Sequence, residues 1–242
     1  MTIKFHLFGL VHLVILASIS GAAAVLSRAA RHTPAWGRAI RLALGAFLAI
    51  NEATWYGYIL WRAGWRFPEG LPLQLCTLAL WSTVIAAVSL NSWAFEFAYF
   101  VGLGGSTMAL LTPDLWAPFP SYPTVYFFLA HGSVVVTVVT LTWGGLARLR
   151  RGCVWRTFAI MNGFAVAVGI FDVLFKTNYM YLCRKPASTS LLDYFGPWPV
   201  YIVVGEVIGL GLFWLLWLPV RYSATRRPTS GTRSDGTNRI AN

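Results

Sequence analysis

The sequence is poor in charged residues, and above all in acidic ones. Of its 242 residues, 11% are charged, whereas soluble domains carry about a quarter. Only 8 are Asp or Glu, against 19 Lys or Arg, which gives a net charge of +11. With 57% hydrophobic residues, this scarcity of charge excludes an ordinary soluble domain and a disordered protein. Three cysteines are too few for a disulfide scaffold.

Several functional motifs are also missing. The sequence contains no GxxxxGK[ST] or HExxH pattern, so nucleotide hydrolysis and zincin chemistry have no support. The last two apolar runs lack the lysine that a retinal Schiff base needs. Nucleic-acid-binding proteins carry their basic charge on a polar surface, which this sequence lacks. We therefore expect no nucleic-acid partner, no metal and no cofactor.

Long apolar runs dominate the chain instead. A bilayer core of about 30 Å requires about 20 apolar residues in a helix, because every backbone group must be hydrogen-bonded within the span. The first run is longer than the core of a secretory signal peptide, so it is read as a helix. The sequence therefore predicts an all-α polytopic membrane protein in one membrane domain, residues 1–220, with seven transmembrane helices. The expected spans are 7–27, 42–61, 73–90, 94–111, 124–144, 157–175 and 199–220.

The basic residues predict the orientation of these spans. Of the 19, 13 lie in the first and fifth connections and the tail, and 6 lie on the other side. By the positive-inside rule, the N-terminus is outside and the C-terminus is cytoplasmic. The tail, residues 221–242, is polar and basic, and is expected to be disordered. We expect a multi-pass protein of the plasma membrane.

Half of the few acidic residues fall inside the expected spans: Glu52, Glu96, Asp172 and Glu206. Ionisable groups at membrane depth are costly and suggest a functional interior. Glu96 is expected near the cytoplasmic end of its helix, where it can reach the interface. The others belong to the outer half, where Asp172 can pair with Lys176 one helical turn later.

A cysteine and a histidine are expected at similar depth. Cys76 lies roughly 6 Å and His131 roughly 10 Å from the outer ends of their spans, at 1.5 Å per residue. A functional reading makes Cys76 a nucleophile with His131 as its base, oriented by Glu206 or Glu52. Alternatively, Cys76 is a small buried hydrophobe or forms a disulfide with Cys183, and the histidine bonds a neighbouring helix.

Polar residues near the outer loops are candidates for substrate binding. Gln74, Asn178, Tyr179 and Tyr181 are possible oxyanion or headgroup donors, and are equally well explained as caps or interfacial aromatics. Arg184 and Lys185 are candidates for holding a lipid phosphate, with ordinary headgroup contact as the alternative.

Several strings together resemble one family. They are Leu71-Pro72-Leu73-Gln74-Leu75-Cys76, Leu110-Leu111-Thr112-Pro113-Asp114, Phe127-Phe128 before His131, and Asn178-Tyr179-Met180-Tyr181-Leu182. Between Glu52 and Glu206 the chain resembles the YwaF-like bacterial integral membrane proteins, which are related to a vertebrate transmembrane lipid acyltransferase. The resemblance implies a seven-helix fold and acyl transfer on phospholipid by a membrane-embedded cysteine, matched here by Cys76, with His131 as the matching histidine. Bacterial members often have His where this chain has Gln74.

The leading hypothesis is a membrane-embedded lipid acyltransferase or acyl hydrolase with a Cys–His site in the outer half of the bilayer. Its substrates would be membrane lipids, with an acyl-chain donor and a lysolipid acceptor. The alternative is a non-enzymatic carrier or receptor with a polar outward-facing pocket, in which Glu52, Glu206 and Asp172 bind a cation or couple to protons. A third hypothesis, a structural or assembly protein, predicts no pocket between spans two, three, five, six and seven.

Overall fold

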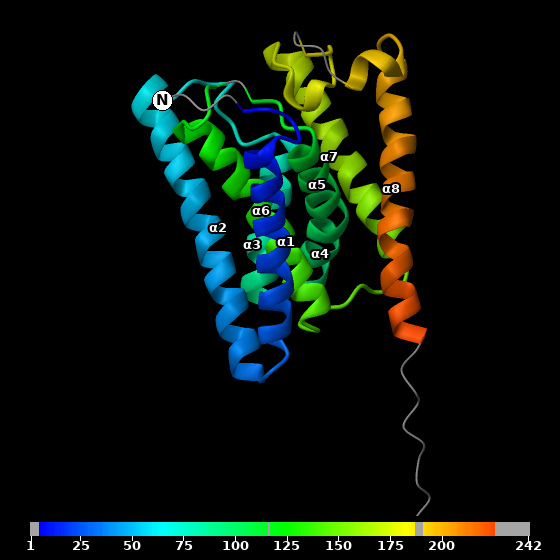
Figure 1. Cartoon of the computed structure of the whole chain (residues 1–242). Helices are drawn as coiled ribbons and strands as arrows, with labels where there is room; N and C mark the ends of the chain where they lie inside the picture. The colour runs from blue at the N-terminus through cyan, green and yellow to red at the C-terminus, as the bar shows by residue number, and fades with distance from the viewer. Residues whose placement is uncertain (1–4, 116, 187–190, 226–242) are drawn as a thin grey trace, which may run out of the picture.

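The computed structural model describes residues 5–115, 117–186 and 191–225, and this part of the chain contains helices and no strand. The long helices run up and down in one bundle (Figure 1). In the view of Figure 1, α1 begins at the upper end of the bundle and α8 ends at the lower end. The elements are α1 (Leu10–Ala30), α2 (Pro34–Ala63), α3 (Leu75–Ser89), α4 (Ser92–Phe97), the π-helical η1 (Ala98–Leu103), α5 (Gly104–Leu111), α6 (Tyr122–Trp143), α7 (Cys153–Phe175), the short 3₁₀ helices η2 (Tyr179–Tyr181) and η3 (Leu191–Phe195), and α8 (Val200–Thr225).

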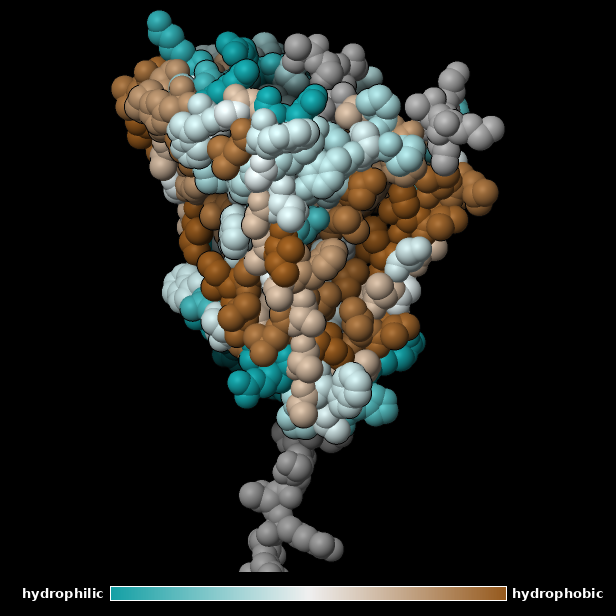
Figure 2. All heavy atoms as spheres, turned by 90° about the vertical axis from the view of Figure 1, so that its left-hand side faces the viewer, coloured by the Kyte–Doolittle hydropathy of each residue, from teal (hydrophilic) through white to brown (hydrophobic). Residues whose placement is uncertain are grey.

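Five helical segments are long and apolar enough to cross a membrane. Four of them are the helices α1, α6, α7 and α8. The fifth is a continuous rod that consists of α4, η1 and α5. Of the other two expected spans, α3 has 15 residues, about 22 Å of helix. The long α2 carries Arg38, Arg41, Asn51 and Glu52, which lower its hydropathy. Figure 2 shows a broad apolar band between polar ends. The chain is therefore an all-helical, multi-pass integral membrane protein.

The helix boundaries follow local capping chemistry. Thr33 accepts a hydrogen bond from the Trp36 amide, and Pro34 supplies a preset φ angle at the first position of α2. Ser121 and Thr124 form a capping box at the start of α6. The structure continues α8 to Thr225, beyond the predicted limit at residue 220, and the rest of the predicted tail lies outside the described residues.

The core is built around the rod of α4, η1 and α5, which packs between α3 and α6. Every residue of η1 is buried. Within it, the Tyr99 hydroxyl donates a hydrogen bond to the carbonyl of Leu216 in α8, at 2.8 Å. By contrast, α1, α7 and α8 expose most of their apolar side chains, which suits helices that face lipid.

The burial of Glu96 differs from expectation. The sequence places it at the interface, but its side chain is 1% exposed and sits at the lower end of the core. Its carboxylate accepts hydrogen bonds from Arg150 Nε at 2.7 Å and Arg156 Nε at 2.8 Å. Both guanidinium groups also lie over the ring of Trp93. A buried carboxylate needs this compensation, so Glu96 is a structural anchor for the loop between α6 and α7.

Candidate active site

A small cavity of about 40 Å³ lies where α2, α3, α5 and α6 meet. Three of the predicted site residues line it together: Glu52, Cys76 and His131. They come from three different helices, so their meeting is a product of the tertiary fold. The remaining lining residues are Thr77, Leu80, Ser106, Tyr126, Ala130 and Val134.

Cys76 occupies the first turn of α3, two residues after the N-cap residue Gln74. The amides of Thr77 and Leu78 both donate to the carbonyl of Gln74. Within the described chain, the amides of Leu75 and Cys76 donate to no other residue. Unpaired amides and the helix dipole favour an anion at this end of a helix. Part of the Cys76 residue is exposed, and the residue also lines the cavity, at a helix end whose dipole favours negative charge.

His131 is held by its own helix. Its Nδ1 lies 2.9 Å from the carbonyl oxygen of Phe127, one turn earlier in α6. A carbonyl can only accept, so Nδ1 carries the hydrogen of this bond, and Nε2 is the nitrogen with the free lone pair. The imidazole also packs against the Phe127 ring, with centroids 4.4 Å apart. A backbone carbonyl thus orients this histidine, in the place where the sequence suggested a carboxylate.

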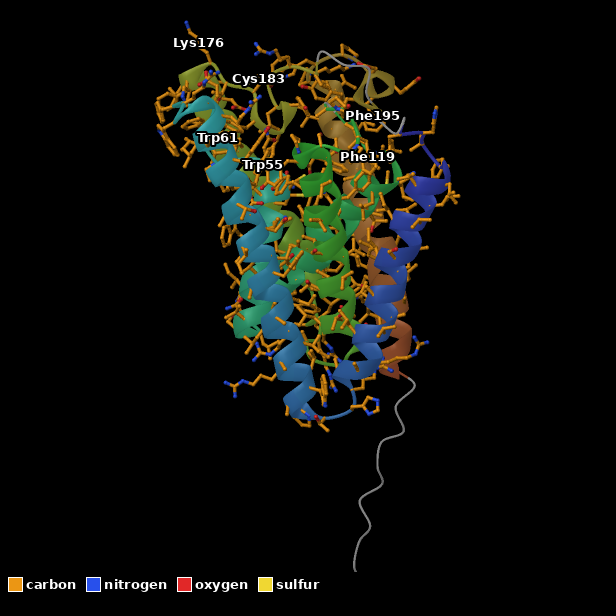
Figure 3. The ribbon with its side chains drawn as sticks, turned by 60° about the vertical axis from the view of Figure 1, so that its left-hand side comes forward. Trp55, Trp61, Phe119, Lys176, Cys183 and Phe195 are labelled. Carbon is orange, nitrogen blue, oxygen red and sulfur yellow. The ribbon has the colours of Figure 1, made fainter. Side chains whose placement is uncertain are left out.

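Glu52 is bonded by a tyrosine that the sequence did not single out. The Tyr126 hydroxyl donates to Glu52 Oε2 at 2.5 Å, and the Tyr126 ring stacks on Trp55 with centroids 4.3 Å apart. Figure 3 shows Trp55 on α2 toward the upper end of the bundle. Glu52 is 1% exposed, so this contact fixes a buried carboxylate at the wall of the cavity.

Tyr126 and Ser106 escaped sequence reasoning for a geometric reason. Tyr126 is five residues before His131, a spacing of about 140° around a helix, so no shared face flags the pair. Ser106 follows a run of glycines and reads as a small packing residue. Neither residue carried a signal that sequence alone would reveal.

The other acidic residues lie elsewhere. Glu206 in α8 accepts a hydrogen bond from Asn162 in α7 at 2.9 Å and is not among the residues that line the cavity. Asp172 accepts from the Thr177 hydroxyl at 2.5 Å and from the Tyr179 amide at 2.9 Å. The expected pair with Lys176 is not among the ion pairs of the described residues, because α7 ends at Phe175 and Lys176 turns into a left-handed conformation.

The predicted polar donors mainly organise the upper loops. Asn178 accepts from the amides of Cys183 and Arg184 and donates to the Arg184 carbonyl. The Tyr179 hydroxyl donates to the Pro68 carbonyl at 2.7 Å and accepts from the amide of Leu71 at 3.1 Å. Burial raises the pKa of Tyr179 above its ordinary value. These bonds tie the α2–α3 loop to the segment after α7, above the cavity.

Gln74 and Tyr181 have structural contacts as well. The side-chain oxygen of Gln74 accepts from the Met180 amide at 3.2 Å. The carbonyl of Tyr181 accepts from the Tyr201 hydroxyl at 2.5 Å. Both contacts join the η2 segment to neighbouring elements, and the Gln74 side chain makes no capping hydrogen bond to its own helix.

Two hollows adjoin this loop layer. A polar hollow of about 270 Å³ is lined by Glu69, Gln74, Lys176, Thr177, Asn178, Tyr179 and Arg184. An apolar hollow of about 260 Å³ lies between α2 and the following loop, and is lined by Tyr56, Ile59, Leu60, Ala63, Gly64, Trp65, Arg66, Glu69 and Gly70. Of the two basic residues that the sequence suggested for phosphate binding, Arg184 lines the polar hollow. Lys185 does not line it, and its Nζ lies 3.9 Å from an Asp193 carboxylate oxygen. Lys176 takes its place beside Arg184.

All three cysteines are free, so the structure contains no Cys76–Cys183 disulfide. Figure 3 shows Cys183 in the loop layer at the upper end, near Lys176. Cys153, at the start of α7, is buried. Among the described residues, no group of three or more His, Cys, Asp or Glu side chains is arranged to hold a metal ion.

Comparison with known proteins identifies the family. The model of the TMEM164 family matches residues 3–217, which cover the helical bundle and the cavity. No match to the chain was found among curated proteins or among solved structures. The chain belongs to the TMEM164 family.

Proposed function

We propose that the chain is a cysteine-dependent lipid acyltransferase of a bacterial plasma membrane. The observation that carries the proposal is that Cys76 and His131, from different helices, line one small cavity with Glu52. A thiol, an imidazole and a carboxylate are the side chains that nucleophilic acyl transfer uses. The plasma-membrane location rests on the resemblance to bacterial membrane proteins.

The proposal includes a seven-pass topology. We count α2 and α3 as spans in addition to the five apolar segments, because both run within the bundle beside them. The upper end, with the Cys76 site, then faces outward, and the lower end, which carries most of the basic residues, faces the cytoplasm. The odd number of passes agrees with α1 beginning and α8 ending at opposite ends of the bundle (Figure 1).

The first half of the reaction would form a thioester. His131 Nε2 takes the proton from Cys76, and the thiolate attacks the carbonyl carbon of a phospholipid ester. The unpaired amides of Leu75 and Cys76 stabilise the tetrahedral oxyanion, as backbone donors do in other acyl-transfer sites. The C–O bond then breaks, the leaving alkoxide takes the proton from the His131 imidazolium, and a lysolipid departs.

The second half would return the thiol. The hydroxyl of a lysolipid acceptor gives its proton to His131 and attacks the thioester. The C–S bond breaks, and Cys76 regains the proton. With water as the acceptor, the same steps release a fatty acid. Glu52 stabilises the imidazolium by its negative charge, and the Tyr126 hydroxyl bond keeps that carboxylate in place.

The small volume of the cavity means that most of a lipid substrate would lie outside it. A volume of about 40 Å³ has room for a water molecule or a small group, and not for an acyl chain. The polar hollow with Lys176 and Arg184 would take the headgroup phosphate. The apolar hollow beside Tyr56 would take part of the chain, so that the ester group comes down onto Cys76.

The carrier hypothesis has less support. It requires Glu52, Asp172 and Glu206 to act along one path, but the three carboxylates lie on three different helices and have separate partners. A purely structural protein would have no such cavity between its spans. Acyl transfer accounts for both the cavity and its reactive side chains.

The test is acyl exchange by purified protein in nanodiscs that contain an isotope-labelled phospholipid and an unlabelled lysophospholipid. Mass spectrometry should detect labelled product from the wild type and only background from Cys76→Ala. The matched control is Cys183→Ala, which should keep full activity. The His131→Gln variant should exchange acyl chains roughly 100-fold more slowly or worse, because a general base usually contributes a rate factor of that size. Undiminished turnover by Cys76→Ala would refute the proposal, and a transport activity lost in Glu206→Gln but kept in Cys76→Ser would favour a carrier.

A further inference from the structure

A larger groove lies in the other half of the bundle, between α1 and α6. Its volume is about 510 Å³, more than ten times that of the Cys76 cavity. On α6, its residues Val135 and Trp143 lie about 6 and 18 Å beyond His131 toward the lower end, at 1.5 Å per residue. The lining residues are Ser20, Ala23, Ala24, Ser27, Arg28, Arg31, Val135, Val139 and Trp143.

The α1 side of this groove is lined by small residues. Ser20, Ala23, Ala24 and Ser27 recur at the spacing that places them on one face of α1. Such small residues commonly allow two helices to pack closely. Here they face a hollow, so the space beside them is open to an occupant from the membrane.

The lower part of the groove is cationic. Arg28 and Arg31 both line it, and both are exposed. The Nε of Arg31 donates to the carbonyl of Trp143, which anchors this guanidinium at the end of α6 and leaves its terminal nitrogens available. Among the described residues, no carboxylate forms an ion pair with either arginine, because Glu96, at this end of the bundle, is bound by Arg150 and Arg156.

A buried hydroxyl adds an independent indication. Ser27 is 6% exposed, lines the groove, and its Oγ has no hydrogen-bond partner in the structure. A buried donor without a partner is unfavourable. A phosphate oxygen at the level of Arg28 and Arg31 would satisfy it.

We propose that this groove binds an anionic phospholipid of the inner leaflet. One acyl chain lies against Ala23, Ala24 and Val139, and the phosphodiester accepts hydrogen bonds from Arg28, Arg31 and Ser27. A zwitterionic lipid would bring its own cation against the two arginines, so the pair selects for net negative charge. Basic pockets between helices at the cytoplasmic end of membrane proteins recognise anionic headgroups in this way. The site is separate from the Cys76 cavity, because Val134 lines one and the next residue, Val135, lines the other.

The experiment compares lipids retained after purification. Full-length protein is equilibrated in nanodiscs of equal phosphatidylglycerol and phosphatidylcholine, extracted into mild detergent, and examined by native mass spectrometry. The wild type should retain phosphatidylglycerol in preference to phosphatidylcholine. Arg28→Gln should weaken that retention about fivefold, the effect of removing one arginine near an anionic lipid surface. The matched control is Arg38→Gln, an exposed arginine outside the groove, which should retain lipid like the wild type.

A second pair of variants tests the shape of the site. Ala24→Leu fills the groove and should abolish the retained lipid, whereas Val25→Leu, on the exposed face of α1, should not. Equal retention of the two lipids by the wild type, or equal loss in Arg28→Gln and Arg38→Gln, would mean ordinary annular lipid only and would overturn the proposal. Because Arg28 is exposed, its variant is expected to fold, and its circular dichroism spectrum verifies this.

Discussion

Replacing Glu96 by glutamine tests the most strongly compensated charge in the structure. Glu96 Oε1 accepts from Arg150 Nε at 2.7 Å and from Arg156 Nη2 at 3.1 Å. Oε2 accepts from Arg156 Nε at 2.8 Å and from Arg150 Nη2 at 3.1 Å. Glutamine preserves the volume and removes the charge, so two guanidinium groups would face each other without a counter-ion.

The magnitude follows from burial. Removing one partner of a buried ion pair costs about 3–5 kcal/mol. The Glu96 side chain is 1% exposed, but the Arg150 and Arg156 side chains are 39% and 25% exposed and can turn partly to water. We therefore expect a loss near the lower limit, about 3 kcal/mol. For a chain of this size, each kcal/mol moves the unfolding midpoint by roughly 2–4 °C, so the shift should be about 6–12 °C.

The assay is thermal unfolding in detergent, followed by tryptophan fluorescence, with the exposed Glu69→Gln as the control. Arg156→Gln alone should cost less, because Glu96 keeps Arg150. The double variant Glu96→Gln/Arg156→Gln should be more stable than the sum of the two single effects, because it also removes an uncompensated cation. A midpoint for Glu96→Gln within about 1 °C of the wild type, or strictly additive losses, would refute this account.

Three further outcomes are expected. Tyr126→Phe should cost about 1–3 kcal/mol, because Glu52 loses its buried donor, and should lower acyl exchange; unchanged melting and activity would contradict the role assigned to this bond. In a Cys76→Ala variant, a membrane-impermeant thiol reagent added to intact cells should label Cys183 and leave the buried Cys153 unmodified, and labelling of Cys153 alone would reverse the proposed orientation. The pKa of Tyr179 is raised by burial, so the hydroxyl loses its proton at higher pH in the folded state than in the unfolded state. The contribution of Tyr179 to the free energy of unfolding is therefore complete below about pH 10 and declines as the pH rises further. The stability advantage of the wild type over Tyr179→Phe should therefore shrink above that pH in melting curves, and a growing advantage would contradict the assigned cause.

The sequence predicted the positions of the long helices along the chain, because long apolar runs mark segments that can cross the apolar layer. Each expected span corresponds to a helix or to the α4–η1–α5 rod. The sequence led us to expect Cys76, His131 and Glu52 at similar depth, and the structure brings all three to one cavity.

The sequence could not predict which face of each helix turns toward the candidate site. Glu206 was expected at the same depth as His131, but α8 presents it to Asn162 on α7. Apolar residues on every side of α8 leave no clear periodic stripe to indicate which face turns inward. For the same reason, the Tyr126 bond to Glu52 was not foreseen.

The hydrogen bonds between the loops at the upper end of the bundle could not be predicted from the sequence either. Tyr179 bonds the Pro68 carbonyl, more than a hundred residues away in sequence, and no local pattern encodes such a contact. The predicted Asp172–Lys176 pair assumed that α7 continues past residue 175. The chain leaves the helix there, and the Asp172 carboxylate caps the following turn through Thr177 and Tyr179.

The two ends of α3 connect a basic residue of α2 with the candidate site. At the lower end, Arg41 of α2 donates from Nη1 to the carbonyls of Ala87 and Val88, each at 2.6 Å. A cation at a helix C-terminus satisfies carbonyls that have no partner within the helix. At the upper end, the amides of Leu75 and Cys76 donate to no other residue in the described part of the chain. Because dipole effects act within one turn of a helix end, Arg41 fixes the position of α3, and only the open first turn can act on the Cys76 thiolate. Arg41, one of the basic residues on which the predicted orientation rests, therefore also holds the helix that carries Cys76.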